Sequence, residues 1–182
     1  MDQEVLFDKN GLKLIKPAKN NYNLQFTLEN NNIILSKIID FSLIKLIYDL
    51  NKDVYEKVNI EKINENEANI FFLMKHFFED LGLPQKFSFF YIKKIETNNK
   101  IIFNSKTITT YRPIDIPDEA EVLNIDNFTT ICEIINPHKI LFNFNIFFSE
   151  NVNIPNFAEK FIGQIINKIF NSLKQFIENV RM

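Results

Sequence analysis

The chain has 182 residues, a length that suits one folded domain with its own hydrophobic core. Hydrophobic residues make up 46% and charged residues 24%, proportions that exclude a disordered chain and a membrane-embedded one. No apolar stretch approaches the roughly 20 residues that span a bilayer, and the acidic N-terminus lacks the pattern of a signal peptide. We therefore expect a single domain over residues 1–182 in an intracellular, cytoplasmic protein.

The charge and the shortage of arginine argue against nucleic acid as a partner. The formal net charge is −2, and the only arginines are Arg112 and Arg181. Forked recognition of phosphate or guanine depends on the guanidinium group, so no nucleic acid is expected to bind. A single cysteine, Cys132, excludes an internal disulfide and a cysteine-based zinc site.

The first 21 residues predict a hairpin that extends the main fold. Short apolar runs flank Asp8–Gly11, where Asn-Gly supplies the left-handed backbone of a tight turn. Apolar and polar residues then alternate over residues 24–28, as in a half-buried strand. Residues 33–39 fit either a returning strand or the start of a helix.

Two helices are predicted next. The first begins at Asp40 or Ser42, either of which suits an N-cap, and runs to about residue 57 with an apolar face. The second covers residues 64–81, and Gly82 stands where a left-handed C-cap belongs.

The chain then changes to alternating patterns that predict about five antiparallel strands. The predicted strands cover residues 87–91, 101–111, 122–125, 128–135 and 140–148. The last of these, with phenylalanine or isoleucine at every second position, has the cleanest alternation in the chain.

The C-terminal segment predicts a long amphipathic helix. Pro155 suits its first position, and apolar residues follow at steps of three or four from Phe157 to Val180. They form two adjacent rows, so a wide apolar face must be buried. Its natural partner is the phenylalanine-rich strand that immediately precedes it.

No constellation of residues predicts catalysis or metal binding. His76 and His138 lie far apart without neighbouring ligands, and Cys132 has no local base to activate it. The three glycines are scattered, which excludes a phosphate-binding loop, and the acidic cluster at 115–121 lacks the register of a calcium loop. We expect no catalytic residue, no metal and no cofactor.

Charge is segregated along the chain. Residues 86–112 are rich in lysine, whereas residues 113–137 carry acidic residues and no lysine or arginine. The basic segment could contact an anionic lipid surface or nucleic acid. The alternative, which we favour, is that adjacent strands of opposite charge neutralise each other.

The order of elements resembles the helix-grip architecture of the START-related lipid-binding superfamily (SRPBCC). The resemblance covers residues 22–182 and is carried by the element order and by the stretch from Lys139 through Val180. It implies an α+β fold in which a curved antiparallel sheet wraps the C-terminal helix and leaves an apolar cavity between them. Separately, the abundance of Ile, Asn, Lys and Phe resembles that of proteins from AT-rich large DNA viruses, which would place the protein in a host cytoplasm.

We therefore predict a non-enzymatic module that binds a hydrophobic small molecule or lipid between the sheet and the C-terminal helix. The predicted wall consists of Phe89, Tyr91, Phe103, Thr107, Tyr111, Phe142, Phe144, Phe161, Ile165 and Ile169. The alternative is a structural or interaction protein with a solid core, such as a virion or assembly component. In that case a protein partner would bind an apolar surface on the helices at 40–82.

Overall fold

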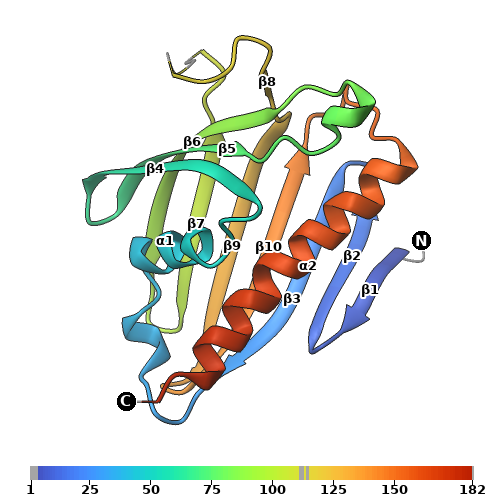
Figure 1. The fold of residues 1–182 in the computed structure, drawn as a ribbon. Coiled ribbons are helices and arrows are strands. Elements are labelled where there is room, and N and C mark those ends of the chain that lie inside the picture. The colour runs from blue at the N-terminus through green and yellow to red at the C-terminus, as the bar shows by residue number, and fades with distance from the viewer. Residues whose placement is uncertain (1–3, 111–112, 114, 182) are drawn as a thin grey trace.

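The computed structural model describes residues 4–110, 113 and 115–181. Within this part of the chain, one curved ten-stranded sheet is combined with two α-helices (Figure 1). The strands are β1 (Glu4–Lys9), β2 (Leu12–Ala18), β3 (Asn21–Glu29), β4 (Tyr55–Asn64), β5 (Glu67–Met74), β6 (Lys86–Glu96), β7 (Lys100–Thr107), β8 (Glu121–Val122), β9 (Ile125–Asn136) and β10 (Lys139–Phe148). The helices are α1 (Phe41–Asp49) and α2 (Asn156–Asn179), and two 3₁₀ turns are η1 (Leu35–Lys37) and η2 (Glu79–Leu81).

The strand order places the C-terminal strand β10 between β3 and β9, and β1 and β4 form the two edges of the sheet. The order is β1-β2-β3-β10-β9-β7-β6-β5-β4, with β8 pairing beside β6. Every pairing is antiparallel except that of β8 with β6, because short turns join most neighbours. The sheet curves, and α2 lies diagonally across its concave face while α1 lies beside it (Figure 1). This is the predicted antiparallel sheet that wraps a long C-terminal helix.

The N-terminal hairpin is confirmed. Asn10 and Gly11 have φ angles of 55° and 73°, which asparagine and glycine tolerate best, and they join β1 to β2. Leu12 and Leu14 of β2 are fully buried in the main core together with residues of β3. The hairpin therefore continues the sheet and contributes to the core.

The first predicted helix starts where expected and ends early. The Asp40 carboxylate accepts a hydrogen bond of 2.7 Å from the backbone N–H of Ser42, so Asp40 is the N-cap of α1. The helix ends at Asp49, and strand β4 begins at Tyr55, inside the range predicted as helical.

The second predicted helix, over residues 64–81, is wrong. This segment contains the end of β4, all of β5 and the short turn η2. Ile70 belongs to the main core cluster, whereas Phe71 packs in a second cluster on the other face of the sheet, with Ile116 and Ala120 of the connection that leads to β8. Because both faces of β5 are covered, its sequence is a continuous apolar run that resembles a buried helix. Gly82 does adopt the predicted left-handed conformation, with φ of 67°, but it closes η2.

The C-terminal helix is confirmed over nearly its whole predicted length. It begins at Asn156, with Pro155 as the N-cap residue, and it ends at Asn179. Gly163 faces β2, where a Cβ atom would lie 3.7 Å from Leu14 Cδ2. In the part of the chain that the structure describes, no helix is both long and apolar enough to cross a membrane.

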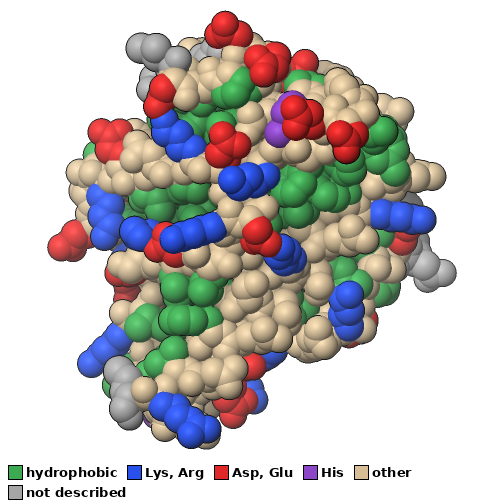
Figure 2. Space-filling view, in the orientation of Figure 1, with side chains coloured by type: hydrophobic (Ala, Val, Ile, Leu, Met, Phe, Trp, Pro, Cys, Tyr) green, Lys and Arg blue, Asp and Glu red, His purple; other side chains and the backbone are tan. Residues whose placement is uncertain are grey.

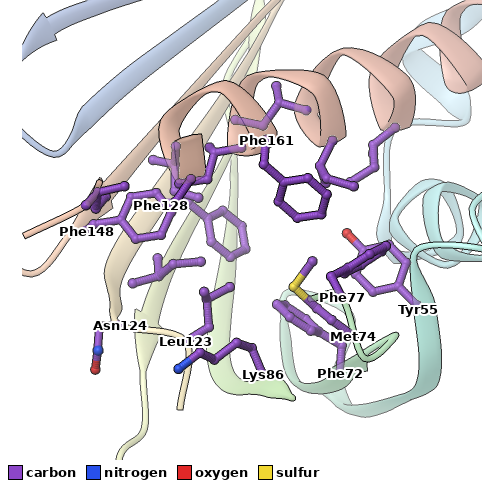
Figure 3. A pocket seen from close by; sticks show the side chains of 18 of the residues that line it. Tyr55, Phe72, Met74, Phe77, Lys86, Leu123, Asn124, Phe128, Phe148 and Phe161 are labelled. Carbon is purple, nitrogen blue, oxygen red and sulfur yellow. The ribbon is translucent and has the colours of Figure 1, made fainter. Parts of the chain in front are cut away.

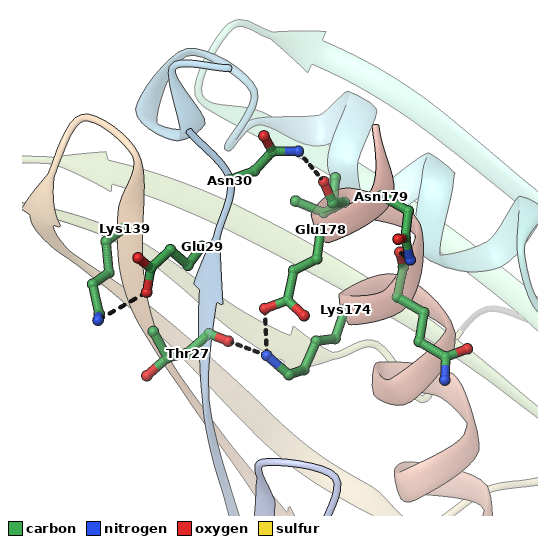
Figure 4. A network of polar contacts seen from close by, with 9 residues as sticks. Thr27, Glu29, Asn30, Lys139, Lys174, Glu178 and Asn179 are labelled. Atoms are coloured by element: carbon green, nitrogen blue, oxygen red, sulfur yellow. Dashed lines mark hydrogen bonds and ion pairs between the residues drawn. The ribbon is translucent and has the colours of Figure 1, made fainter. Parts of the chain in front are cut away.

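Polar contacts hold α2 to the N-terminal strands near both of its ends. Near the first turn, Glu159 Oε1 accepts from Lys16 Nζ at 2.5 Å and from the Tyr22 hydroxyl at 2.9 Å. Near the last turn, Lys174 Nζ donates to the carbonyl oxygen of Thr27 at 2.8 Å, and the Asn30 side chain reaches the end of the helix (Figure 4). These contacts fix the position of the helix on β2 and β3.

Opposite charges are paired between neighbouring strands. Lys86 of β6 and Glu121 of β8 approach to 2.7 Å, and Lys100 of β7 and Glu133 of β9 approach to 3.6 Å. Both pairs join the lysine-rich segment to the acidic one. For Lys86 and Lys100, these pairs agree with the favoured interpretation that adjacent strands of opposite charge neutralise each other.

Candidate functional site

A cavity of about 470 Å³ lies between α2, α1 and the concave face of the sheet. In Figure 3, α2 covers the cavity from one side, and side chains of β4–β6, β9 and β10 surround the hollow beneath it. The wall is almost entirely apolar and rich in aromatic rings. It includes Leu43, Ile44, Ile47, Tyr48, Tyr55, Phe72, Met74, Phe77, Phe78, Phe90, Phe103, Leu123, Phe128, Thr130, Phe142, Phe144, Ile146, Phe148, Phe157, Ala158, Phe161, Ile162, Ile165, Ile166, Ile169 and Phe170.

The two halves of α2 meet the sheet differently. Phe170, in the C-terminal half, packs against Phe26 and Phe142 with ring centroids 5.7 Å apart in both pairs. Phe161 and Ile165, in the N-terminal half, are only partly buried and line the cavity. The packed rings around Phe170 thus bound one end of the hollow, and the N-terminal half of α2 lies along it.

All five predicted wall residues from the C-terminal strand and helix line this cavity. These are Phe142, Phe144, Phe161, Ile165 and Ile169, together with Phe103 of β7.

Three predicted wall residues, Phe89, Tyr91 and Thr107, are not among those that line it. Phe89 packs on the opposite face of the sheet, and the Tyr91 hydroxyl there donates to Glu67. Thr107 donates its hydroxyl to the carbonyl oxygen of Ile125 and does not itself line the cavity. Tyr111 lies outside the described residues. In β6, Phe90 points toward the main core. Because nearly all residues from Phe87 onward are apolar, the sequence does not show which face of this strand is turned inward.

Several wall residues were missed at the sequence level. Tyr48 and Tyr55 fall in the segment predicted as one helix, and Phe77 falls in the second predicted helix, so no sheet-facing pattern was sought there. Phe128 could have been found, because it alternates with Thr130 and Cys132 along β9 at the period of a strand.

An aromatic clasp closes one side of the cavity. We use this name for Phe77 and Phe78, which follow β5, together with Phe157 and Phe161 of α2. The Phe161 ring lies 4.9 Å from Phe77 and 4.5 Å from Phe78, and Phe78 lies 6.0 Å from Phe157. Edge-to-face rings at these distances attract one another beyond their burial. In Figure 2 apolar side chains surface in separate patches on this face, one of them between α2 and the connection after β5.

The clasp contains a strained residue. Phe78 has φ of 64° and ψ of 27°, a left-handed conformation that is costly for a bulky side chain. Such strain is kept only where surrounding contacts hold it. Here the Phe78 ring contacts α2, and the Phe78 carbonyl accepts hydrogen bonds from the backbone N–H groups of Leu81 and Leu83.

The chemistry of the wall is that of a binding site. As far as the wall is described, it contains no aspartate, glutamate, histidine or cysteine. Its polar side chains within the hollow are the hydroxyls of Tyr48, Tyr55 and Thr130, with lysine and asparagine at its margin. A pocket with few polar groups among aromatic residues suits an apolar guest that those groups orient.

The remaining candidate reactive groups lie outside this wall. Cys132 is fully buried in the core, and burial raises the pKa of its thiol to about 12, so it stays protonated at neutral pH as an inert core residue. Within the described ranges, no three His, Cys, Asp or Glu side chains gather as metal ligands do.

Solved structures with this architecture are found at very low sequence identity. Human StAR-related lipid transfer protein 5 superposes with a TM-score of 0.69 at 11% identity, over 96% of this chain and 86% of that one. The lipid transfer and protein localization domain of human StarD13 gives 0.70 at 6% identity, over 98% and 90%. A STAR-related lipid transfer protein fragment from Xanthomonas axonopodis gives 0.64 at 10% identity, over 96% and 98%.

The chain has a START-like helix-grip fold. No protein-family model matches the sequence, and no curated protein matches it either. The START-like fold is thus recognised through the shape of the backbone, as the order of elements in the sequence predicted. At these identities the likeness establishes the fold, and function has to be argued from the cavity itself.

Proposed function

We propose that this START-like chain binds a hydrophobic small molecule or lipid in the cavity between α2 and the sheet, without converting it chemically. The observation that carries the proposal is the size and lining of the cavity. Its volume of about 470 Å³ lies within the range of small-molecule pockets, roughly 300–1,000 Å³. The described wall offers no acid–base pair, which is why binding rather than catalysis is proposed.

The energetics of an apolar void favour an occupant. Apolar side chains that line an unfilled hollow lose dispersion contacts on that side, which is a cost to the folded state. Water is a poor filler, since it needs two to four polar partners that this wall scarcely offers. An apolar guest removes the cost and buries its own surface as well.

The structural neighbours support the same proposal. The names of the human and Xanthomonas proteins above describe lipid transfer, and they share this fold over most of both chains. The rival proposal, a solid-core protein with an apolar partner surface at 40–82, has less support. Four apolar residues within that range, Ile70, Phe71, Phe72 and Leu73, are buried in the sheet.

Recovery of a guest from the purified protein is the direct test. Native mass spectrometry and solvent extraction should detect a bound apolar molecule at close to one per chain. Ala158 lies on α2 and lines the cavity, so Ala158→Trp should fill the space and abolish recovery. Gln164→Trp adds the same side chain at an exposed position of α2 and should leave recovery unchanged. If extracts are empty, and the folded protein takes up no apolar probe, the proposal is wrong.

A further inference from the structure

Two tyrosines adjoin at one wall of the cavity. Tyr48 stands in the last turn of α1, and Tyr55 is the first residue of β4. Their ring centroids lie 4.7 Å apart at an interplanar angle of 79°, and both rings also pack against Phe72. In Figure 3 the Tyr55 hydroxyl faces the hollow beneath α2. The short connection from α1 to β4 thus brings two phenol groups to one place in an otherwise apolar wall.

These two hydroxyls differ from those of the other tyrosines that the structure describes. Tyr22 donates to Glu159 and Tyr91 donates to Glu67. Neither Tyr48 nor Tyr55 forms a hydrogen bond within the described residues, and their rings contact each other and Phe72. Both residues are half-buried and line the cavity, where their hydroxyls are open to a ligand, whereas phenylalanine would fill the same shape with no group to bond one. The chain uses 20 phenylalanines and five tyrosines, so hydroxyls at two adjoining cavity positions call for a partner from outside the chain.

The electrostatics of the pair select an uncharged partner. Burial raises the pKa of Tyr55, and burial together with the neighbouring Tyr55 raises that of Tyr48, so both phenols are neutral at physiological pH. A neutral phenol both donates and accepts, which matches a hydroxyl or a carbonyl group. An ionised group would lose its hydration among these rings. Two lysines lie on the wall: Lys86 is paired with Glu121, and Lys75, just after β5, is an exposed residue.

We infer that Tyr48 and Tyr55 together bind the polar end of an uncharged ligand that carries a hydroxyl or carbonyl group on an apolar body. The inference rests on the proposed function and deepens it, because it names the ligand class. The apolar body would occupy the phenylalanine-lined space toward Phe128 and Phe144, and the two phenols would orient the molecule at the α1 side. A neutral lipid alcohol or ketone fits this description, whereas a fatty-acid anion and a plain hydrocarbon do not.

Three fluorescent probes with the same body and different ends separate these possibilities. They are a pyrene-labelled dodecanol, the matching pyrene-labelled dodecanoate and the matching pyrene-labelled dodecane. Binding of each to the delipidated full chain is measured by fluorescence at pH 7.4. Because each net hydrogen bond contributes a modest free energy, the alcohol should bind about three- to tenfold more tightly than the alkane. The carboxylate should bind more weakly than the alcohol.

The double variant Tyr48→Phe/Tyr55→Phe is the decisive protein. It keeps both rings, and it should lose the preference for the alcohol over the alkane while its affinity for the alkane stays within twofold of the original. Tyr91→Phe removes a hydroxyl on the opposite face of the sheet and is the matched control; it should keep the full preference. Thr130→Val removes the third hydroxyl of the wall and should also keep it.

The possible results distinguish this inference from the proposed function. If all three probes bind but the double variant keeps the alcohol preference, or if Thr130→Val alone abolishes it, the assignment to the tyrosine pair is overturned and the binding function stands. Tighter binding of the carboxylate overturns the uncharged ligand class. If none of the probes binds, both the inference and the proposed function fail.

Discussion

The side-chain amide of Asn30, just beyond the end of β3, donates to the carbonyl oxygen of Ile177 in the last turn of α2 over 2.6 Å. The same nitrogen reaches the carbonyl oxygen of Val180 at 2.9 Å. The last carbonyls of a helix have no partner within the helix, and here a neighbouring strand supplies one from a side chain that is only 4% exposed. A residue 147 positions earlier in the chain thus caps the C-terminal helix.

We expect Asn30→Ala to destabilise the fold by about 1–3 kcal/mol, because it leaves buried carbonyl groups without a donor. Urea denaturation followed by circular dichroism measures the change as a lower midpoint at an unaltered slope. Asn179→Ala is the control, since the Asn179 amide bonds only to Gln175 within the exposed surface of the helix. Its effect should stay within about 0.5 kcal/mol, and an equal loss in both variants would contradict the capping role.

The sequence predicts best those elements that bury only one of their faces, such as α2 and β10. Residues of α2 repeat at the helical period, and those of β10 alternate cleanly, because each element meets the core on one side only. The segment Ile70–Leu73 has no such contrast. Ile70 meets the main core and Phe71 meets Ile116 on the other side, so every position is apolar and periodicity cannot choose between strand and helix. The residues that pack on this second face, such as Ile116, come from a connection distant in sequence, so no local pattern predicts them.

The ion pair at the start of α2 makes stability dependent on pH. Burial tends to raise the pKa of Glu159, but hydrogen bonds from Lys16 and Tyr22 outweigh it and hold the pKa below its usual value of 4.5. A carboxylate with a lowered folded pKa contributes stability that is present above its unfolded pKa and is lost as the pH falls through the folded value. Glu159→Gln should therefore cost about 1–3 kcal/mol at pH 7, and the gap to the original protein should close below about pH 4.5.

Unfolding free energies from urea titrations at pH 7, 5, 4 and 3 test this expectation. Glu150→Gln, at an exposed loop position, is the control and should give no gap at any of these values. A gap for Glu159→Gln that persists unchanged at pH 3 would show that the carboxylate's charge is not what anchors the helix.

Gly163 offers a stabilising change. It lies inside α2, where glycine is about 1 kcal/mol less favourable than alanine. A Cβ atom there would meet Leu14 Cδ2 at 3.7 Å, which is ordinary van der Waals contact. Gly163→Ala should therefore raise the unfolding free energy by up to about 1 kcal/mol. A higher melting temperature would confirm it, whereas a lower one would show that helix and β2 need the closer approach.

The site was less predictable from sequence than the fold. Phe142, Phe144, Phe161 and Ile165 could be predicted as neighbours because consecutive elements carry them. The opposite wall comes from the end of α1 and the start of β4, and Tyr55 reaches the cavity only because the chain turns into a strand there. Predicting such a site requires every contributing element to be assigned correctly. Because the first helix was predicted to run to residue 57, the strand that carries Tyr55 was not recognised as part of the wall.

The aromatic clasp makes a prediction about the rate of ligand release. Phe161 contacts Phe77 and Phe78 at once, and each such ring pair contributes about 0.5–1.5 kcal/mol beyond burial. Phe161→Ala removes both contacts and part of the support for the strained backbone at Phe78. If ligand leaves through this side of the wall, the dissociation rate of the pyrene-labelled dodecanol should rise about tenfold. Stopped-flow dilution into an excess of unlabelled dodecanol measures that rate.

Phe176→Ala is the matched control, because Phe176 lies on the same helix, is 44% exposed and is not among the residues that line the cavity. It should leave the release rate unaltered. A second variant, Phe78→Gly, removes the ring and relieves the left-handed strain together, since glycine adopts positive φ freely. It should also speed release, because both contacts of the Phe78 ring with α2 are lost, while that of Phe77 with Phe161 remains. Release rates equal to the original in both variants would place the ligand's path on another side of the cavity, away from the clasp.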